Sequence, residues 1–94
     1  MEKYRIAHIK VSNQDVILVE VAWTLGSKTP GQQESIRSYI EQCAHAAGLA
    51  GTVALVWQSG KRIMSFGPTA WHGYLSSLTP EYVLANLRNE LTCG

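Results

Sequence analysis

The order of apolar and polar positions in the first quarter of the chain predicts a β-hairpin. Apolar and polar residues alternate over residues 4–11, and a second run, rich in β-branched residues, covers residues 16–23. Alternation with a period of two is typical of a strand that buries one face. The residues between these runs, Ser12-Asn13-Gln14-Asp15, bond their own backbone or tolerate left-handed conformations, which favours a turn. We therefore expect an antiparallel pair, with Trp23 on the same face as Val19 and Val21.

A long helix is predicted to begin at Thr29-Pro30. Thr29 can cap it, Pro30 fits the first helical position, and Gln32 stands where a capping box requires it. Apolar residues then recur at helical spacing, and Gly48 supplies a stop; they are Ile36, Tyr39, Ile40, Cys43, Ala44 and Ala47. The opposite, solvent-facing side is expected to carry Gln32, Glu34, Arg37 and Glu41.

The second half of the chain repeats the order of hairpin and helix. Residues 52–58 alternate, Ser59-Gly60-Lys61 forms a tight turn, and residues 62–66 complete the hairpin. A short helix is expected over residues 70–77. A final helix is expected to begin at Thr79-Pro80, with an apolar stripe of Val83, Leu84, Leu87 and Leu91.

These elements predict one α+β domain over residues 1–94, with the order ββαββα. We expect a four-stranded antiparallel sheet with the helices packed on one face. The other face would then be open, and it is a natural place for a homodimer contact if it carries residues such as Tyr4, Ile6, Ala54 or Val56. The residues expected in the core are Val19, Val21, Ile36, Ile40, Leu55, Leu87 and Leu91.

Composition narrows the class of protein. Hydrophobic residues make up 46% of the 94 residues and charged residues only 16%, which excludes a disordered chain. The net charge of +1 argues against duplex nucleic acid as a partner, since such binders neutralise several phosphates. The chain holds no apolar run long enough for a membrane helix, and its charged start is unlike a signal peptide. Two cysteines are too few for a disulfide scaffold, so we expect free thiols and a cytoplasmic protein.

Few residues are arranged for metal binding or catalysis. Cys43 and His45 lie two residues apart on the predicted helix, so their side chains diverge by about 200°, and we expect no metal site and no cofactor. His72 and Ser76 have helical i,i+4 spacing, but no acidic residue stands near His72 in the sequence. A small enzyme or ligand-binding domain with a site assembled around His72 or a cysteine therefore remains an alternative function.

The segment of residues 66–74 is the most distinctive part of the sequence. It places Trp71, His72 and Tyr74 in a stretch punctuated by glycine and proline. Trp and Tyr are enriched at binding hot spots, although both also serve as core residues that would pin the last helix to the sheet. The basic pair Lys61-Arg62 at the hairpin tip is added to this candidate protein-binding surface.

The leading hypothesis is a non-enzymatic protein-interaction module, such as an adaptor, an inhibitor or a regulatory subunit, with another protein as partner. Low charge, aromatic residues and the lack of a catalytic motif favour it. A weaker alternative is a single-strand nucleic-acid binder in which a base stacks on Trp57 beside Lys61 and Arg62.

Overall fold

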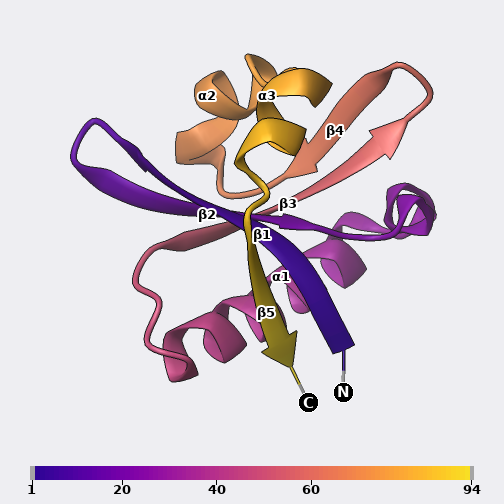
Figure 1. Cartoon of the computed structure of the whole chain (residues 1–94). Helices are drawn as coiled ribbons and strands as arrows, with labels where there is room; N and C mark the ends of the chain where they lie inside the picture. The colour runs from indigo at the N-terminus through magenta and orange to yellow at the C-terminus, as the bar shows by residue number, and fades with distance from the viewer. Residues whose placement is uncertain (1, 94) are drawn as a thin grey trace.

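The computed structural model describes residues 2–93 and shows a mixed five-stranded sheet with helices on both faces (Figure 1). The strands are β1 (Glu2–Val11), β2 (Gln14–Glu20), β3 (Thr52–Ser59), β4 (Arg62–Phe66) and β5 (Asn89–Cys93). The α-helices are α1 (Pro30–Ala46), α2 (His72–Ser76) and α3 (Pro80–Asn86), and two 3₁₀ helices are η1 (Trp23–Ser27) and η2 (Thr69–Trp71). The predicted α+β class is confirmed, whereas the number and pairing of the strands differ from the prediction.

Both predicted hairpins are present. β1 pairs antiparallel with β2, with Ile6 opposite Val19, and β3 pairs antiparallel with β4, with Leu55 opposite Phe66. The first turn places Ser12 and Asn13 at φ values of 51° and 66°. Two consecutive residues with positive φ give the backbone twist that a tight hairpin requires.

The two hairpins do not join in the predicted antiparallel way, because β2 and β3 run parallel, with Ile17 opposite Val53. Parallel neighbours need a long crossover, usually a helix. The 17 residues of α1 span about 25 Å at 1.5 Å per residue, so they return the chain to the starting end of β2. The apolar alternation that identified each strand carries no information about its direction.

The predicted final helix is wrong in its second half. α3 ends at Asn86, and the chain then forms β5, which pairs antiparallel with β1 at the sheet edge. Leu91 and Cys93 point inward while Glu90 and Thr92 are exposed, which is the alternation of a strand. Leu84, which we expected on the buried stripe, is 48% exposed. The sheet order is therefore β4-β3-β2-β1-β5.

Helices cover both faces of the sheet, contrary to the prediction of one covered face. α1 packs over one face, with Ile6, Ile17 and Leu55 in its core cluster. α2 and α3 pack over the other face, where the cluster includes Ala54 and Val56. Tyr4 and Ile6 belong to the first cluster, so the four residues proposed for an open dimer face lie on opposite sides of the sheet against helices. Within residues 2–93, no helix has the length and apolar character needed to cross a membrane.

Most of the predicted core residues are buried. The buried members are Val19, Ile40, Leu55, Leu87 and Leu91. Val21 and Ile36 are partly buried and pack against the α1-side cluster. The predicted start of α1 is also confirmed, because Thr29 Oγ1 accepts from the Gln32 backbone N–H and the Gln32 side chain accepts from the Thr29 backbone N–H.

Arg37 is not on the solvent-facing side of α1 as expected. Arg37 is only 8% exposed. Its guanidinium donates hydrogen bonds to the Val53 carbonyl at 3.0 Å and to the Glu41 carboxylate at 2.8 Å. Glu41 in turn accepts from the Val53 backbone N–H at 3.0 Å. β4 reaches only to Phe66, opposite Leu55, so the backbone of Val53 lacks a strand partner on that side. Arg37 and Glu41 thus satisfy two buried backbone groups.

The acidic neighbours of Arg37 also stabilise its positive charge. The carboxylate of Glu34 accepts from Arg37 Nε at 2.8 Å, and this hydrogen bond raises the pKa of Arg37 and lowers the pKa of Glu34 from their ordinary values. The two acidic partners therefore compensate the one buried charged residue that the described chain contains.

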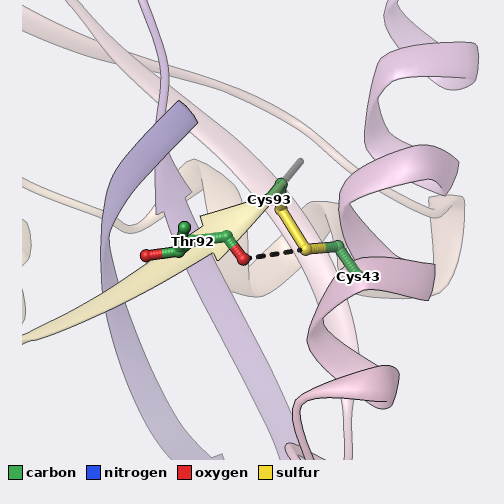
Figure 2. The surroundings of a disulfide bond; sticks show 3 residues. All are labelled: Cys43, Thr92 and Cys93. Carbon is green, nitrogen blue, oxygen red and sulfur yellow. Dashed lines mark hydrogen bonds between the residues drawn. A yellow bond between two sulfur atoms is a disulfide. The ribbon is translucent and has the colours of Figure 1, made fainter. Parts of the chain in front are cut away.

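Cys43 of α1 and Cys93 of β5 form a disulfide, with their Cα atoms 5.9 Å apart (Figure 2). The prediction of two free thiols is therefore wrong. It rested on the number of cysteines, whereas the bridge depends on β5, which places Cys93 beside α1 as the next inward residue after Leu91. The cytoplasmic interpretation loses this support and stays a prediction.

Candidate functional site

One end of the sheet is left uncovered on the face that α2 and α3 share. These helices gather at one end of the sheet, while β5 and the N-terminal half of β1 extend away from them (Figure 1). The strand alternation that buries Ala7, Leu18 and Val56 directs polar residues to the same face further along. We call this the uncovered sheet end; its residues are Lys3, Arg5, Glu20, Gln58, Glu90 and Thr92.

The cross-strand row at Arg5 is held by a bidentate ion pair. Arg5 Nε donates to Glu20 Oε1 at 2.8 Å, and the second guanidinium nitrogen donates to Glu20 Oε2 at 2.7 Å. Hydrogen bonding to Glu20 raises the pKa of Arg5 from its ordinary value. Two parallel bonds of this kind fix both side chains in one plane. The charge of Glu20 is thereby neutralised at the uncovered sheet end.

An open groove of about 430 Å³ lies beside this ion pair. We call it the Trp23 groove; it is lined by Lys3, Tyr4, Glu20, Val21, Ala22, Trp23 and Gln58. Among residues 2–93, the Lys3 side chain makes no hydrogen bond or ion pair. The groove therefore combines one ammonium group that has no ion-pair partner in the described part of the chain with a large aromatic surface.

Trp23 is the most exposed of the large apolar side chains in the described part of the chain, at 72%. The strand β2 ends at Glu20, and the chain turns into η1, where Leu25 is buried. Gly26 lies directly on the Trp57 indole, because a Cβ built at this glycine would stand 3.0 Å from Trp57 Nε1. The carbonyl of Leu25 also accepts from the Gln33 side chain at 2.9 Å. These contacts fix η1 to the core while Trp23 remains in solvent.

Sequence reasoning missed Trp23 as a site residue, because the apolar alternation continued through it and placed it on the buried face of a strand. The break in the strand at Val21-Ala22 carries no proline or glycine. The only available signal was Leu25-Gly26-Ser27-Lys28, which indicated that a loop follows.

The predicted aromatic segment is mostly packed. Trp71 and Tyr74 are half-buried against the cluster under α2 and α3, with an edge-to-face contact at a centroid distance of 6.0 Å. The hydroxyl oxygens of Tyr74 and Tyr82 lie 3.4 Å apart, and burial, followed by this contact, raises the pKa of Tyr74. This packing agrees with the core role that the sequence also allowed for Trp71.

The other predicted site residues are exposed, and the basic pair lies apart from the aromatic residues. Lys61 and Arg62 are at the tip of the β3–β4 hairpin, and His72 is exposed at the start of α2. The four steps from Arg62 to Phe66 cover about 13 Å at 3.3 Å per residue. The hairpin tip and the Trp71 segment are therefore at opposite ends of β4, which Figure 1 also shows.

Some of the residues behind the alternative functions are engaged elsewhere in the fold. Trp57 is only 6% exposed, so a base cannot stack on it without repacking the core. Cys43 and Cys93 form a disulfide with each other, so neither is a free thiol in this structure. Among residues 2–93, the His72 imidazole makes no hydrogen bond or ion pair, and no group of three potential ligands is arranged for a metal ion.

Searches of protein-family models, curated proteins and solved structures found no match to this chain.

Proposed function

We propose that this protein is a non-enzymatic protein-interaction module and that the Trp23 groove receives a segment of its partner. The observation that carries the proposal is the 72% exposure of Trp23 on a backbone fixed to the core. An exposed indole offers a large contact area, and tryptophan is the residue type most enriched at binding hot spots. Because η1 is already ordered, little entropy is lost when the partner binds.

The charges around the groove favour a partner segment that carries an apolar side chain next to a carboxylate. Of the charged residues that line the groove, Glu20 is paired with Arg5, whereas the Lys3 ammonium has no ion-pair partner among the described residues. An apolar side chain can pack on Trp23 while the carboxylate lies near the Lys3 ammonium. Charge complementarity of this type contributes mainly to specificity and to the rate of association.

The surface predicted from the sequence, with Trp71, His72, Tyr74, Lys61 and Arg62, is a weaker place for the contact. Its two large aromatic residues pack against the core cluster, and the exposed basic pair lies at the other end of β4. A homodimer is retained as an outcome of the test below, although the apolar sheet face first considered for it is covered by helices.

The test begins by identifying the partner at the groove itself. A photo-crosslinking amino acid is placed at position 23, and a matched variant carries it at position 84, where Leu84 is 48% exposed on α3. A protein that crosslinks at position 23 but not at position 84 is then purified, and its Kd for the intact chain is measured. We expect an adduct with a different protein rather than with a second copy of this chain.

Binding to that partner should depend on both groove residues. Trp23→Ala should raise the Kd by about 30-fold or more, which corresponds to a loss of about 2 kcal/mol of binding free energy. Lys3→Glu should also weaken binding, and the loss should be larger at low salt than at high salt, because salt screens interactions between exposed charges. Leu84→Ala, which also removes an exposed apolar side chain, should leave the Kd unchanged.

Two results would contradict the proposal. One is an unchanged Kd for Trp23→Ala in a variant that retains the melting temperature of the parent chain. The other is a crosslink at position 23 that joins two copies of the chain, with self-association in sedimentation that Trp23→Ala abolishes.

A further inference from the structure

The two sulfur atoms of the disulfide have unequal access to solvent. Cys43 is partly exposed and lines an open hollow of about 450 Å³, together with Tyr39, Gln42, Ala46, Ala47 and Thr92. Cys93 is only 2% exposed and belongs to the core cluster on the α1 side. The small side chains of Ala46 and Ala47 leave room above Cys43, so a reagent can approach one end of the bridge from solvent.

We propose that the Cys43–Cys93 disulfide is a thiol-exchange site that is attacked at Cys43 by a thiol or dithiol reductant. The attacking thiolate forms a bond to Cys43 Sγ, and the bond between the two protein sulfurs breaks. Cys93 leaves with the electron pair and takes a proton from solvent. In the second step, a second thiolate attacks the reductant's own sulfur in the mixed disulfide and releases Cys43. The reductant is oxidised to a disulfide, and the protein gains two thiols.

The structure provides a hydrogen-bond acceptor for the Cys43 thiol that results. Cys43 Sγ lies 3.4 Å from the carbonyl oxygen of Thr92, along the contact drawn in Figure 2. A disulfide sulfur has no proton to donate, whereas the reduced thiol does. Reduction therefore replaces a covalent link between α1 and β5 with a weak hydrogen bond between the same two elements.

The element released by this exchange is β5. It is an edge strand that pairs only with β1, and Cys93 is its last residue. After reduction, β5 is held by its backbone ladder to β1, by Leu91 in the core and by the packing of Cys93. We expect the backbone amides of residues 89–93 to exchange with deuterium at least about tenfold faster in the reduced protein than in the oxidised protein, while the amides of β2 and β3 change little. This inference does not depend on the proposed function of the Trp23 groove.

The point of attack is tested with glutathione as the probe. The folded, oxidised protein is treated with reduced glutathione, free thiols are trapped with N-ethylmaleimide, and the protein is cut with trypsin. Cleavage after Arg37, Lys61 and Arg88 separates the two cysteines into peptides 38–61 and 89–94. We expect glutathione on the Cys43 peptide and N-ethylmaleimide on the Cys93 peptide.

A matched pair of variants tests entry through the hollow. Ala46→Phe fills the space above Cys43, whereas Ala85→Phe adds the same bulk at an exposed position on α3. The initial rate of exchange should fall at least about threefold in Ala46→Phe and stay unchanged in Ala85→Phe. The rate in the parent protein should also vary little with low concentrations of urea, because attack on the folded state exposes little new surface.

Four results would overturn the proposal. The first is glutathione on the Cys93 peptide, and the second is an equal rate for the two phenylalanine variants. The third is a rate that rises with urea as steeply as global unfolding does. The fourth is the finding of two free thiols in denatured protein that has never met a reductant.

Discussion

At the scale of single residues, the three tryptophans show how position decides what one side chain does. Trp57 is 6% exposed beneath η1, Trp71 is half-buried against the core cluster that α2 and α3 cover, and Trp23 is 72% exposed. Burying Trp57 stabilises the fold through the apolar area that it removes from water. Trp23 contributes little of this kind, and its exposed indole is the surface on which the proposed binding function depends.

Arg37 provides the first prediction at this scale. Arg37→Met keeps the length of the side chain but leaves the Val53 carbonyl without its donor and Glu41 without its cation. The free energy of unfolding should fall by about 2–3 kcal/mol, since an unsatisfied buried acceptor and a broken buried ion pair both cost stability. Urea denaturation measures the change.

The matched control for Arg37 is Arg62→Met at the exposed hairpin tip, where the effect should stay within about 0.5 kcal/mol. An equally small loss for Arg37→Met would mean that solvent reaches the Val53 carbonyl. The role of Arg37 would then be no more than that of a surface pair.

The sequence could not reveal the surroundings of Arg37 or Trp23, because the first depend on how α1 packs against β3 and the second on where β2 ends. Helical spacing correctly places Arg37 with Glu34 and Glu41. Its burial follows from the packing of α1 against β3 beyond the end of β4; the sequence predicted that end correctly, but it did not predict this packing. Most apolar residues in regular alternation, such as Val19 and Leu55, were correctly predicted to be buried because their strands are covered on both faces.

At the scale of elements, starts were more predictable than ends. Thr29-Pro30 and Thr79-Pro80 both precede helices, and in each case the threonine side chain accepts from the backbone N–H three residues later. The end of α3 had no such signal, because Leu87 and Leu91 continue a helical spacing while Leu91 and Cys93 also fit a strand. The free edge of β1 decides between these two patterns, since pairing with β5 satisfies its backbone groups.

The change from helix to strand predicts unequal effects of two leucine substitutions. Leu91→Ala removes a buried side chain of β5 and should lower the free energy of unfolding by about 2–5 kcal/mol. Leu84→Ala removes a side chain that is 48% exposed on α3 and should cost less than about 0.5 kcal/mol. Urea denaturation of both variants decides the point, and a large loss at Leu84 would favour the single long helix that the sequence suggested.

At the scale of the whole molecule, the first and last strands lie side by side in the sheet. β5 pairs with β1 from Cys93 opposite Glu2 to Asn89 opposite Ile6, and the disulfide ties the same strand to α1. The sequence indicated the hairpins and the main helix correctly, but the joining of hairpins through a parallel pair and the disulfide both result from long-range packing. Pairings of this kind are set by which surfaces remain uncovered once the local elements have formed.

The disulfide should contribute to equilibrium stability through the unfolded chain. It joins residues separated by 50 positions, so it restricts the loop that the unfolded polypeptide would otherwise explore. In the chain-entropy account such a link is worth roughly 2–4 kcal/mol.

Urea denaturation of the oxidised parent, the reduced parent and Cys43→Ala separates this effect from packing. The reduced parent keeps every side chain, and its loss should nearly equal that of Cys43→Ala, because the residue is only partly buried. Identical urea midpoints for the oxidised and reduced parent, with unchanged dependence of the unfolding free energy on urea, would show that the disulfide does not stabilise the fold.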